Sequence, residues 1–224
     1  MSAGPGRLVL VVGTGTEIGK TWVSCRLLER WRAAGVAVAA RKPAQSFEPG
    51  QGPTDAELLA AASGEAPEVV CPPERSYPVP AAPPLAARRL GRTPLRLRDL
   101  VEALDWPEPG PAVGLVETAG GLRSPQAEDG DAVDLAVALR PACVVLVANA
   151  GLGTIHAVRS AVGPLAGVPP AVVVVLNRYD PADVVHDENR RWLAETDGLD
   201  VCVADGPGLD ALAAALAGTT VRVP

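Results

Sequence analysis

The sequence predicts an α/β fold, a doubly wound and mostly parallel sheet with helices on both faces, on three observations. Short valine-rich runs recur along the chain and are almost continuously apolar, as strands buried on both faces of a parallel sheet are. Helical patterns separate most of these runs, which is typical of this fold class. The first run leads straight into a glycine-rich loop that ends in Gly19-Lys20-Thr21.

The apolar runs are bounded by Gly, Pro or Asp, which interrupt regular structure. They predict strands at residues 7–12, 36–41, 112–116, 142–148, 171–176 and 200–204. Helical spacing of apolar residues predicts helices at 20–33, 54–62, 95–104, 131–139, 154–165, 183–196 and 207–217. A length of 224 residues fits one domain of the larger α/β kind. We therefore expect a single domain over residues 1–224.

Residues 50–84 differ from the rest because they are dense in proline and glycine. We expect an ordered excursion rather than a linker, since predicted strands of the same domain flank the segment. Thr54 followed by Glu57 has the spacing of a capping box at a helix start. Asp55 stands at this helix start, where it has either a local structural role or a role in a site.

Composition excludes several classes of protein. The apolar share is 48% with only 3% aromatic residues, so the core is built from Ala, Val and Leu. A net charge of −6 gives no electrostatic footprint for nucleic acid. No apolar run reaches the ~18 residues of a membrane helix, and we expect a soluble cytoplasmic protein with no membrane partner. The widely spaced cysteines are expected to be small buried apolar residues rather than metal ligands; they are Cys25, Cys71, Cys143 and Cys202.

The glycine-rich loop departs from the standard phosphate-loop pattern by one residue. Five residues separate Gly13 from Gly19, where the pattern has four. The context still fits, because a strand precedes the loop, a helix follows it, and Gly15 lets backbone approach a phosphate. Lys20 would then reach the β- and γ-phosphates and Thr21 would bind Mg²⁺. The alternative is an ordinary glycine-rich turn, but the context favours a phosphate-loop NTPase type of fold.

Two further positions carry charge at predicted strand ends. The chain has only two lysines, Lys20 in the loop and Lys42 after the second strand. A lysine at the carboxyl edge of a parallel strand lies on the side where such sheets bind ligands, although chance retention is the alternative. Glu117 closes the third strand, and hard cations prefer oxygen ligands such as Thr21, Asp55 and Glu117. Glu117 has a local capping role as its alternative.

With these stretches in place, the chain resembles the dethiobiotin synthetases, a family of phosphate-loop enzymes. The segment from Gly13 to Thr21 matches the family's loop, including the residue that spoils the standard pattern. Further matches over roughly residues 7–180 are Lys42-Pro43 with Ser46, Asp55, Glu117 with Ala119-Gly120-Gly121, Leu152-Gly153-Thr154 and Asn177.

The resemblance implies a reaction of biotin synthesis. ATP, CO₂ and 7,8-diaminononanoate would give dethiobiotin, a cyclic urea, with ADP and phosphate. One amine becomes a carbamate, a carbamate oxygen takes the γ-phosphoryl group to give a carbamic-phosphoric anhydride, and the second amine displaces phosphate. ATP would be the co-substrate and Mg²⁺ the cofactor. The resemblance also implies a homodimer, in which segment 151–155 of one subunit offers helix N-terminal amides to the substrate carboxylate bound by the other.

The resemblance implies roles for individual residues. Those expected in catalysis are Lys42, Thr16, Lys20 and Ser46. Those expected at the nucleotide are Gly15, Thr16, Glu17, Ile18, Gly19, Lys20, Thr21, Trp22, Asp55, Glu117, Gly120 and Asn177, with Asn177 reading adenine. Those expected at the diamine are Thr16, Lys42, Ser46, Gly121, Leu152, Gly153 and Thr154. The expected metal ligands are Thr21, Asp55 and Glu117.

The chain departs from the family pattern at four places, one of which is the stretch from Val203 to Gly206, where the proline expected near the adenine pocket is lacking. Thr118 replaces a glycine, Arg123-Ser124 follows where apolar residues are common, and His156-Ala157 stands in place of Asn-His. A family member with an altered substrate or a lost activity is therefore an alternative. We expect His156 to face solvent at its helix start, with contact to the substrate carboxylate as the other interpretation.

An interpretation from another class is a partner-binding switch ATPase of the cell-division or partition type. Such proteins usually carry a second lysine five places before the loop lysine, where this chain has Gly15. They often end in a basic amphipathic helix, and the tail from Leu209 to Pro224 has one arginine. Both features count against a switch.

Two smaller features complete the sequence-based expectations. Arg88, Arg89 and Arg92 form a basic run that reads as a solvated helix face, with binding of an anionic substrate as the alternative. For Trp22, packing of the early helix is favoured over stacking on the nucleotide.

Overall fold

The computed structural model describes residues 4–168 and 170–218. The strands are β1 Arg7–Gly13, β2 Val38–Arg41, β3 Gln45–Ser46, β4 Ser76–Tyr77, β5 Val113–Glu117, β6 Cys143–Asn149, β7 Val172–Asn177 and β8 Asp200–Val203. The helices are α1 Lys20–Ala33, α2 Asp55–Ser63, α3 Pro67–Val70, α4 Pro83–Arg89, α5 Leu97–Glu102, α6 Ala132–Leu139, α7 Thr154–Leu165, α8 Val184–Arg191 and α9 Gly206–Ala217. A 3₁₀ turn (Pro73–Arg75) and a π turn (Trp192–Thr196) complete the elements of the described residues.

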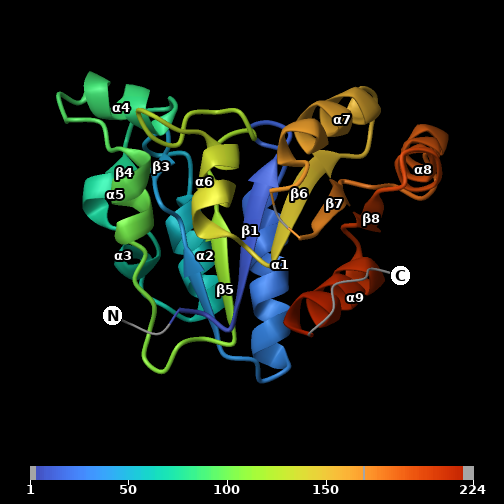
Figure 1. The fold of residues 1–224 in the computed structure, drawn as a ribbon, viewed down its shortest axis with the longest axis horizontal. Coiled ribbons are helices and arrows are strands. Elements are labelled where there is room, and N and C mark those ends of the chain that lie inside the picture. The colour runs from blue at the N-terminus through green and yellow to red at the C-terminus, as the bar shows by residue number, and fades with distance from the viewer. Residues whose placement is uncertain (1–3, 169, 219–224) are drawn as a thin grey trace.

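Six strands form one sheet in the order β2-β5-β1-β6-β7-β8, and every pairing between neighbours is parallel. The strand arrows in Figure 1 therefore all point to one edge, where α4 and α7 also lie. The chain winds outward in both directions from β1, which places the loop after β1 at the point where ligands bind in such sheets. The predicted fold class is confirmed.

Helices cover both faces of this sheet because side chains of each strand alternate between the faces. Val9 and Val11 of β1 pack with one buried cluster, which contains α1, α2 and α9. Leu10 and Val12 pack with the other, which contains α6 and α7. All six predicted strands and all seven predicted helices exist, with ends that differ by at most three residues apart from the long helix 183–196, which ends in the π turn.

The proline-rich excursion is ordered, as expected. It carries α3, the 3₁₀ turn and β4, and β4 pairs in parallel with β3 in a small second sheet. A separate buried cluster under α4 includes Tyr77 and Leu100. The capping box at Thr54 and Glu57 is present, with Thr54 as the N-cap of α2. The elements α3, β3 and β4 and the 3₁₀ turn were not predicted, because elements of two to four residues leave no periodic signal.

The cysteines behave as predicted. Cys71, Cys143 and Cys202 are buried, and Cys25 packs partly buried against the core. Burial raises the pKa of the Cys143 and Cys202 thiols to about 12, so neither is a nucleophile near neutral pH. Within the described residues, no helix is both long enough and apolar enough to cross a bilayer.

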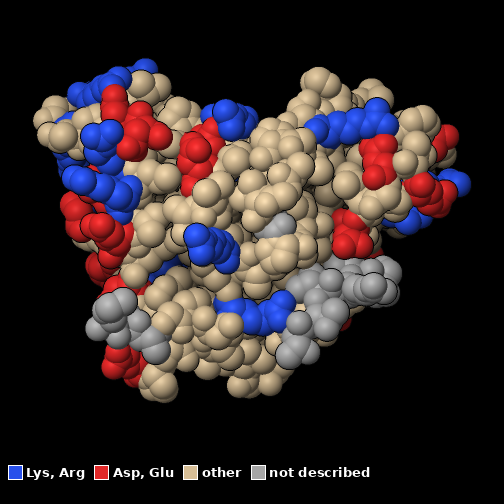
Figure 2. Space-filling model, viewed as in Figure 1, with Lys and Arg blue, Asp and Glu red and all other residues tan. Residues whose placement is uncertain are grey.

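Basic and acidic side chains are interleaved around α4 and α5, as Figure 2 shows on one face of the molecule. Arg88 pairs with Glu128, and Arg96 lies 2.9 Å from Asp129. Arg92 lies over the Tyr77 ring. Two members of the basic run after Pro84, Arg88 and Arg92, are thus engaged in local contacts. Arg222, the arginine of the predicted tail, lies outside the described residues.

Candidate active site

A cavity of about 550 Å³ opens at the carboxyl edge of the sheet, between the phosphate loop and the excursion. The excursion contributes a wall that contains Gln51 and Pro80. Of the residues predicted to act, those that line this cavity are Thr16, Glu17, Gly19, Lys20, Thr21, Lys42, Ser46, Asp55 and Gly120. Segments far apart in the sequence therefore meet where the fold predicts a ligand.

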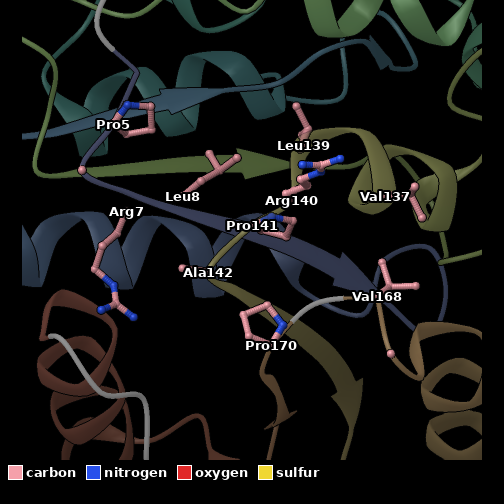
Figure 3. Close-up of a pocket in the computed structure, with 12 residues that line it drawn as sticks. Pro5, Arg7, Leu8, Val137, Leu139, Arg140, Pro141, Ala142, Val168 and Pro170 are labelled. Atoms are coloured by element: carbon pink, nitrogen blue, oxygen red, sulfur yellow. The ribbon is translucent and has the colours of Figure 1, made fainter.

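A larger hollow of about 720 Å³ lies at the opposite edge, by the amino ends of β1 and β6. Figure 3 shows Val137, Val168 and Pro170 around it. Arg7, which also borders it, donates a hydrogen bond to the Gly218 carbonyl. Parallel sheets bind substrates at the carboxyl ends of their strands, so this hollow is not the candidate active site.

The backbone of the phosphate loop is shaped by two left-handed residues. Glu17 has φ 58°, and Gly19 has φ 90° as the N-cap of α1, with no side-chain cap. A Cβ on Gly19 would lie 2.0 Å from Nδ2 of Asn177, so only glycine fits there. The uncapped helix start leaves backbone N–H groups for an anion.

Asn177, the last residue of β7, and Arg178, which follows it, hold the outer side of this loop. Asn177 donates from Nδ2 to the Ile18 carbonyl at 2.9 Å, and Arg178 donates to the Glu17 carbonyl at 2.8 Å. Carbonyls that are held outward leave the N–H groups of the loop free to face inward. Asn177, predicted at the adenine, thus contacts the loop in this structure; its contact with adenine stays a prediction. Arg178 was missed.

Charged side chains meet below the loop. Lys42 donates from Nζ to Asp55 at 2.6 Å and to Glu117 at 2.7 Å. The Thr21 hydroxyl lies 2.8 Å from an oxygen of each carboxylate and can donate to one of them at a time. Ser24 donates to the second Glu117 oxygen at 2.6 Å. Lys42 and Glu117 are only 1% and 0% exposed, so this is a buried ion pair with its hydrogen bonds satisfied.

The environment of this cluster shifts three pKa values. Burial alone would lower the pKa of Lys42, but the charges of Glu117 and Asp55 outweigh it and raise that pKa above its usual value. Burial alone would raise the pKa of Asp55, but Lys42 and the Thr21 hydrogen bond lower it. Burial, and then the charge of Lys42, lower the pKa of Lys20. Lys42 is therefore a permanent cation and Asp55 a permanent anion near neutral pH.

The donor set of this cluster fits Mg²⁺. The Thr21 hydroxyl lies within hydrogen-bond distance of carboxylate oxygens of Asp55 and Glu117, and Mg²⁺ is bound by one or two carboxylates with phosphate oxygens and water. In the part of the chain that the structure describes, no three His, Cys, Asp or Glu side chains gather to hold a metal by themselves. The cluster thus fits a cation that arrives with a phosphate ligand.

The Ser46 hydroxyl can only accept hydrogen bonds from a ligand in the cavity. It donates to the Ala81 carbonyl at 2.5 Å, so its proton is engaged and its lone pairs remain. The same bond ties the excursion to the site. Ser46 is therefore placed to accept a hydrogen bond from an amine.

Other predicted residues do not line the cavity. Gly121 supports it from behind: a Cβ there would lie 3.2 Å from Gly15 Cα, so the two backbones touch closely. Trp22 is 44% exposed with Arg26 of the same helix over its ring at 5.5 Å, and its stacking on the nucleotide stays a prediction. Leu152-Gly153-Thr154 leads into α7 outside the cavity of its own chain, and Leu152 is 92% exposed. His156 is exposed, as expected.

Comparison with known proteins decides the family. A family model described as an AAA domain matches residues 7–211. The chain is 42% identical over 181 residues to the ATP-dependent dethiobiotin synthetase BioD of Anaeromyxobacter dehalogenans, covering 79% of each chain. It is 37% identical over 211 residues to BioD of Rhodococcus jostii, covering 93% of this chain and 90% of that one. The chain belongs to the dethiobiotin synthetase family.

The resemblance to this family, first inferred from the phosphate loop of the chain, is thus confirmed. The relatives are named as ATP-dependent synthetases, which are enzymes rather than switches. A nucleotide-binding protein in complex with ADP from Archaeoglobus fulgidus has a TM-score of 0.52 at 16% identity, over 93% of this chain and 86% of that one. FtsY from Elizabethkingia anophelis in complex with GDP has a TM-score of 0.51 at 16% identity, over 94% of this chain and 60% of that one. Both similarities show the shared fold alone.

Proposed function

We propose that this protein carboxylates 7,8-diaminononanoate with CO₂ and closes the product to the cyclic urea dethiobiotin, with ATP converted to ADP and phosphate. The observation that carries the proposal is the position of Lys42. Its ammonium lies between two carboxylates at the floor of a cavity that the phosphate loop borders on one side and Ser46 on the other. Membership of the dethiobiotin synthetase family supports the same reaction.

The chemistry balances in three steps. An amine nitrogen of the substrate adds to the carbon of CO₂ and loses a proton, which gives a carbamate. A carbamate oxygen then bonds to the γ-phosphorus of ATP, the bond to the bridging oxygen breaks, and ADP leaves. Finally the second amine adds to the carbamoyl carbon, phosphate leaves with the former carbamate oxygen, and the nitrogen loses a proton.

The residues act mainly by charge and position, as phosphoryl transfer requires. The backbone amides around Gly19 and the Lys20 ammonium hold the phosphates. Lys42 supplies a fixed positive charge where carbamate and γ-phosphate meet. Thr16 and Ser46 bind the reacting amine or carbamate, and Asn177 reads the adenine base.

We propose that Thr21, Asp55 and Glu117 hold Mg²⁺. When bound, the ion supplies positive charge to the phosphate oxygens. Glu117 keeps its orientation through Ser24, which is one helical turn beyond Thr21 on α1. Asp55, at the start of α2, is held in place by the capping box of Thr54.

Thr118, one of the departures from the family pattern, leaves this cavity unchanged. Thr118 is 0% exposed and donates from its hydroxyl to the Val11 carbonyl at 3.2 Å, so it faces β1 rather than the cavity. Thr118 therefore gives no structural reason to expect a loss of activity. We propose that residues 1–224 act as one catalytic domain built on the six-stranded sheet, in the cytoplasm where ATP is available.

We propose that two copies share the site, with Leu152, Gly153 and Thr154 of one copy binding the carboxylate end of the substrate held by the other. Gly153 is a left-handed N-cap with no side-chain cap, which leaves helix N–H groups for an anion. A Leu152→Glu change puts a negative charge on this surface. We expect the dimer to dissociate in sedimentation and the KM for the diamine to rise about tenfold, since interface-core residues carry most of the binding energy.

The matched control is Val69→Glu, which changes an apolar residue of α3 that is 48% exposed. It should leave both sedimentation and KM at the wild-type values. A wild-type protein that sediments as a monomer and still turns over the diamine would contradict the shared site.

The proposed reaction is tested by incubating the protein with ATP, Mg²⁺, bicarbonate and 7,8-diaminononanoate. We expect a cyclic urea by mass spectrometry and one phosphate released per urea formed. ATP binding without urea formation would contradict the proposal. ATP hydrolysis that does not depend on the diamine would instead favour a switch ATPase.

A further inference from the structure

We propose that Ser124 donates a hydrogen bond to an oxygen of the substrate's carbamate and is thereby a specificity-determining residue of this chain. The inference rests on the proposed function. Ser124 lines the same cavity as Thr16, Lys42 and Ser46. It stands in the loop that follows β5.

The hydroxyl of Ser124 has a free proton. Its oxygen accepts from the Gly121 N–H at 3.0 Å. Within the described residues, the Ser124 hydroxyl donates to no protein acceptor. A hydroxyl that only accepts from the protein has its O–H left to donate to a ligand.

The position of this hydroxyl is fixed by its neighbours. The buried side chain of Gln126 donates to the Ser124 carbonyl at 3.0 Å and to the Ala119 carbonyl at 2.7 Å. The Ser124 N–H donates to the Gly121 carbonyl at 2.9 Å, which closes a tight turn. Arg123 pairs with Asp131 at 2.9 Å and anchors the outside of this turn. The loop therefore presents Ser124 in a preorganised orientation.

Gly120 brings the hydroxyl close to the phosphate loop. A Cβ on Gly120 would lie 2.7 Å from Ser124 Oγ and 3.8 Å from Thr16 Oγ1, so the two hydroxyls flank the same face of this glycine. Gly120 also has φ 65°, which favours glycine. Ser124 thus lies beside the residue that the resemblance places at the reacting amine or carbamate.

The hydroxyls of Ser46 and Ser124, the two serines of the cavity, have opposite hydrogen-bonding roles. The Ser46 proton is engaged with Ala81, so Ser46 accepts, whereas the Ser124 proton is free, so Ser124 donates. A carbamate has an N–H that donates and oxygens that accept. This pairing matches a carbamate better than a free amine, which carries no acceptor oxygen. The γ-phosphate, the other oxyanion in the cavity, is already served by Lys20 and the loop amides.

Three variants test the inference. In Ser124→Ala we expect kcat/KM for the diamine to fall about 10- to 100-fold, the range for a hydrogen bond to a charged group. The KM for ATP should stay within about twofold, since that binding does not use the hydroxyl. Ser124→Thr, which keeps the O–H, should restore most of the activity. Ser160→Ala, at an exposed serine of α7, is the control and should match wild type.

Ser124→Asp separates recognition from support of the turn. Its carboxylate can still accept from the Gly121 N–H but donates nothing and repels an anionic carbamate. We expect kcat/KM for the diamine to fall further than in Ser124→Ala. Recovery in Ser124→Asp would show that only the turn matters, and a rise in the KM for ATP equal to the loss for the diamine would place the hydroxyl at the γ-phosphate. Either result overturns the inference.

The inference can also fail separately from the proposed function. A wild-type protein that forms cyclic urea, with Ser124→Ala equally active, overturns only the role of Ser124. A wild-type protein that forms no cyclic urea overturns both.

Discussion

A Lys42→Ala variant is expected to lose turnover by about 10³-fold while its affinity for ATP stays within about threefold, as for a charge that acts on the transferring phosphoryl group. The Lys42 ammonium is 1% exposed and lies at the cavity floor, so no water or neighbouring lysine replaces its charge. In the proposed mechanism the phosphates themselves are held by Lys20 and the loop amides. Turnover is measured by urea formation and ATP affinity by calorimetry, well below the melting transition of the variant.

Lys20→Ala is the matched control, since it removes the other lysine of the chain. It should lose ATP affinity as well as turnover. Lys42→Arg should fail to restore activity, because a planar guanidinium cannot satisfy the same contacts to Asp55 and Glu117. Equal loss of ATP affinity in Lys42→Ala and Lys20→Ala would contradict this division of roles.

A Glu117→Gln variant is expected to lose about 3 to 5 kcal/mol of stability, as when one partner of a buried ion pair is removed. Glu117 is 0% exposed and accepts from Lys42 and Ser24. The amide nitrogen of glutamine would face one of these donors, so a hydrogen bond is lost along with the charge. For a chain of this length the melting temperature should fall by roughly 6 to 20 °C, and Mg²⁺-dependent turnover should be lost.

Differential scanning calorimetry checks this expectation against Glu68→Gln, at an exposed glutamate of α3. The control should melt within about 1 °C of wild type, as surface changes usually do. If Glu117→Gln also melted within about 2 °C of wild type, the buried ion pair would not carry the stability that we assign to it.

The sequence predicted the parts of the fold that depend on local pattern. The valine runs became the six-stranded sheet, and Thr54 and Glu57 formed their capping box, because buried strands and caps leave signals within a few residues. The pairing of β3 with β4 and the cluster around Tyr77 were missed. Those contacts join short segments about thirty residues apart, and neither segment has a periodicity of its own.

The candidate site was predicted in the same uneven way. The gathering of Lys42, Asp55 and Glu117 followed from strand ends and a helix start, which a parallel sheet brings to one edge. Ser24 was missed, although its spacing of three residues from Thr21 places both on one face of α1. Arg178 had no such signal, because its contact with the phosphate loop depends on the left-handed backbone at Arg178 itself.

The central claim is that ATP is cleaved by the carbamate oxygen of a carboxylated diamine, with Lys42 between the two. Its most direct test supplies freshly dissolved CO₂ labelled with ¹⁸O, in ordinary water, and follows the label at short times by mass spectrometry. The mechanism predicts ¹⁸O in the released phosphate and in the urea carbonyl, in equal amounts. Phosphate without ¹⁸O would mean that water rather than the carbamate oxygen cleaves ATP, and would contradict the account.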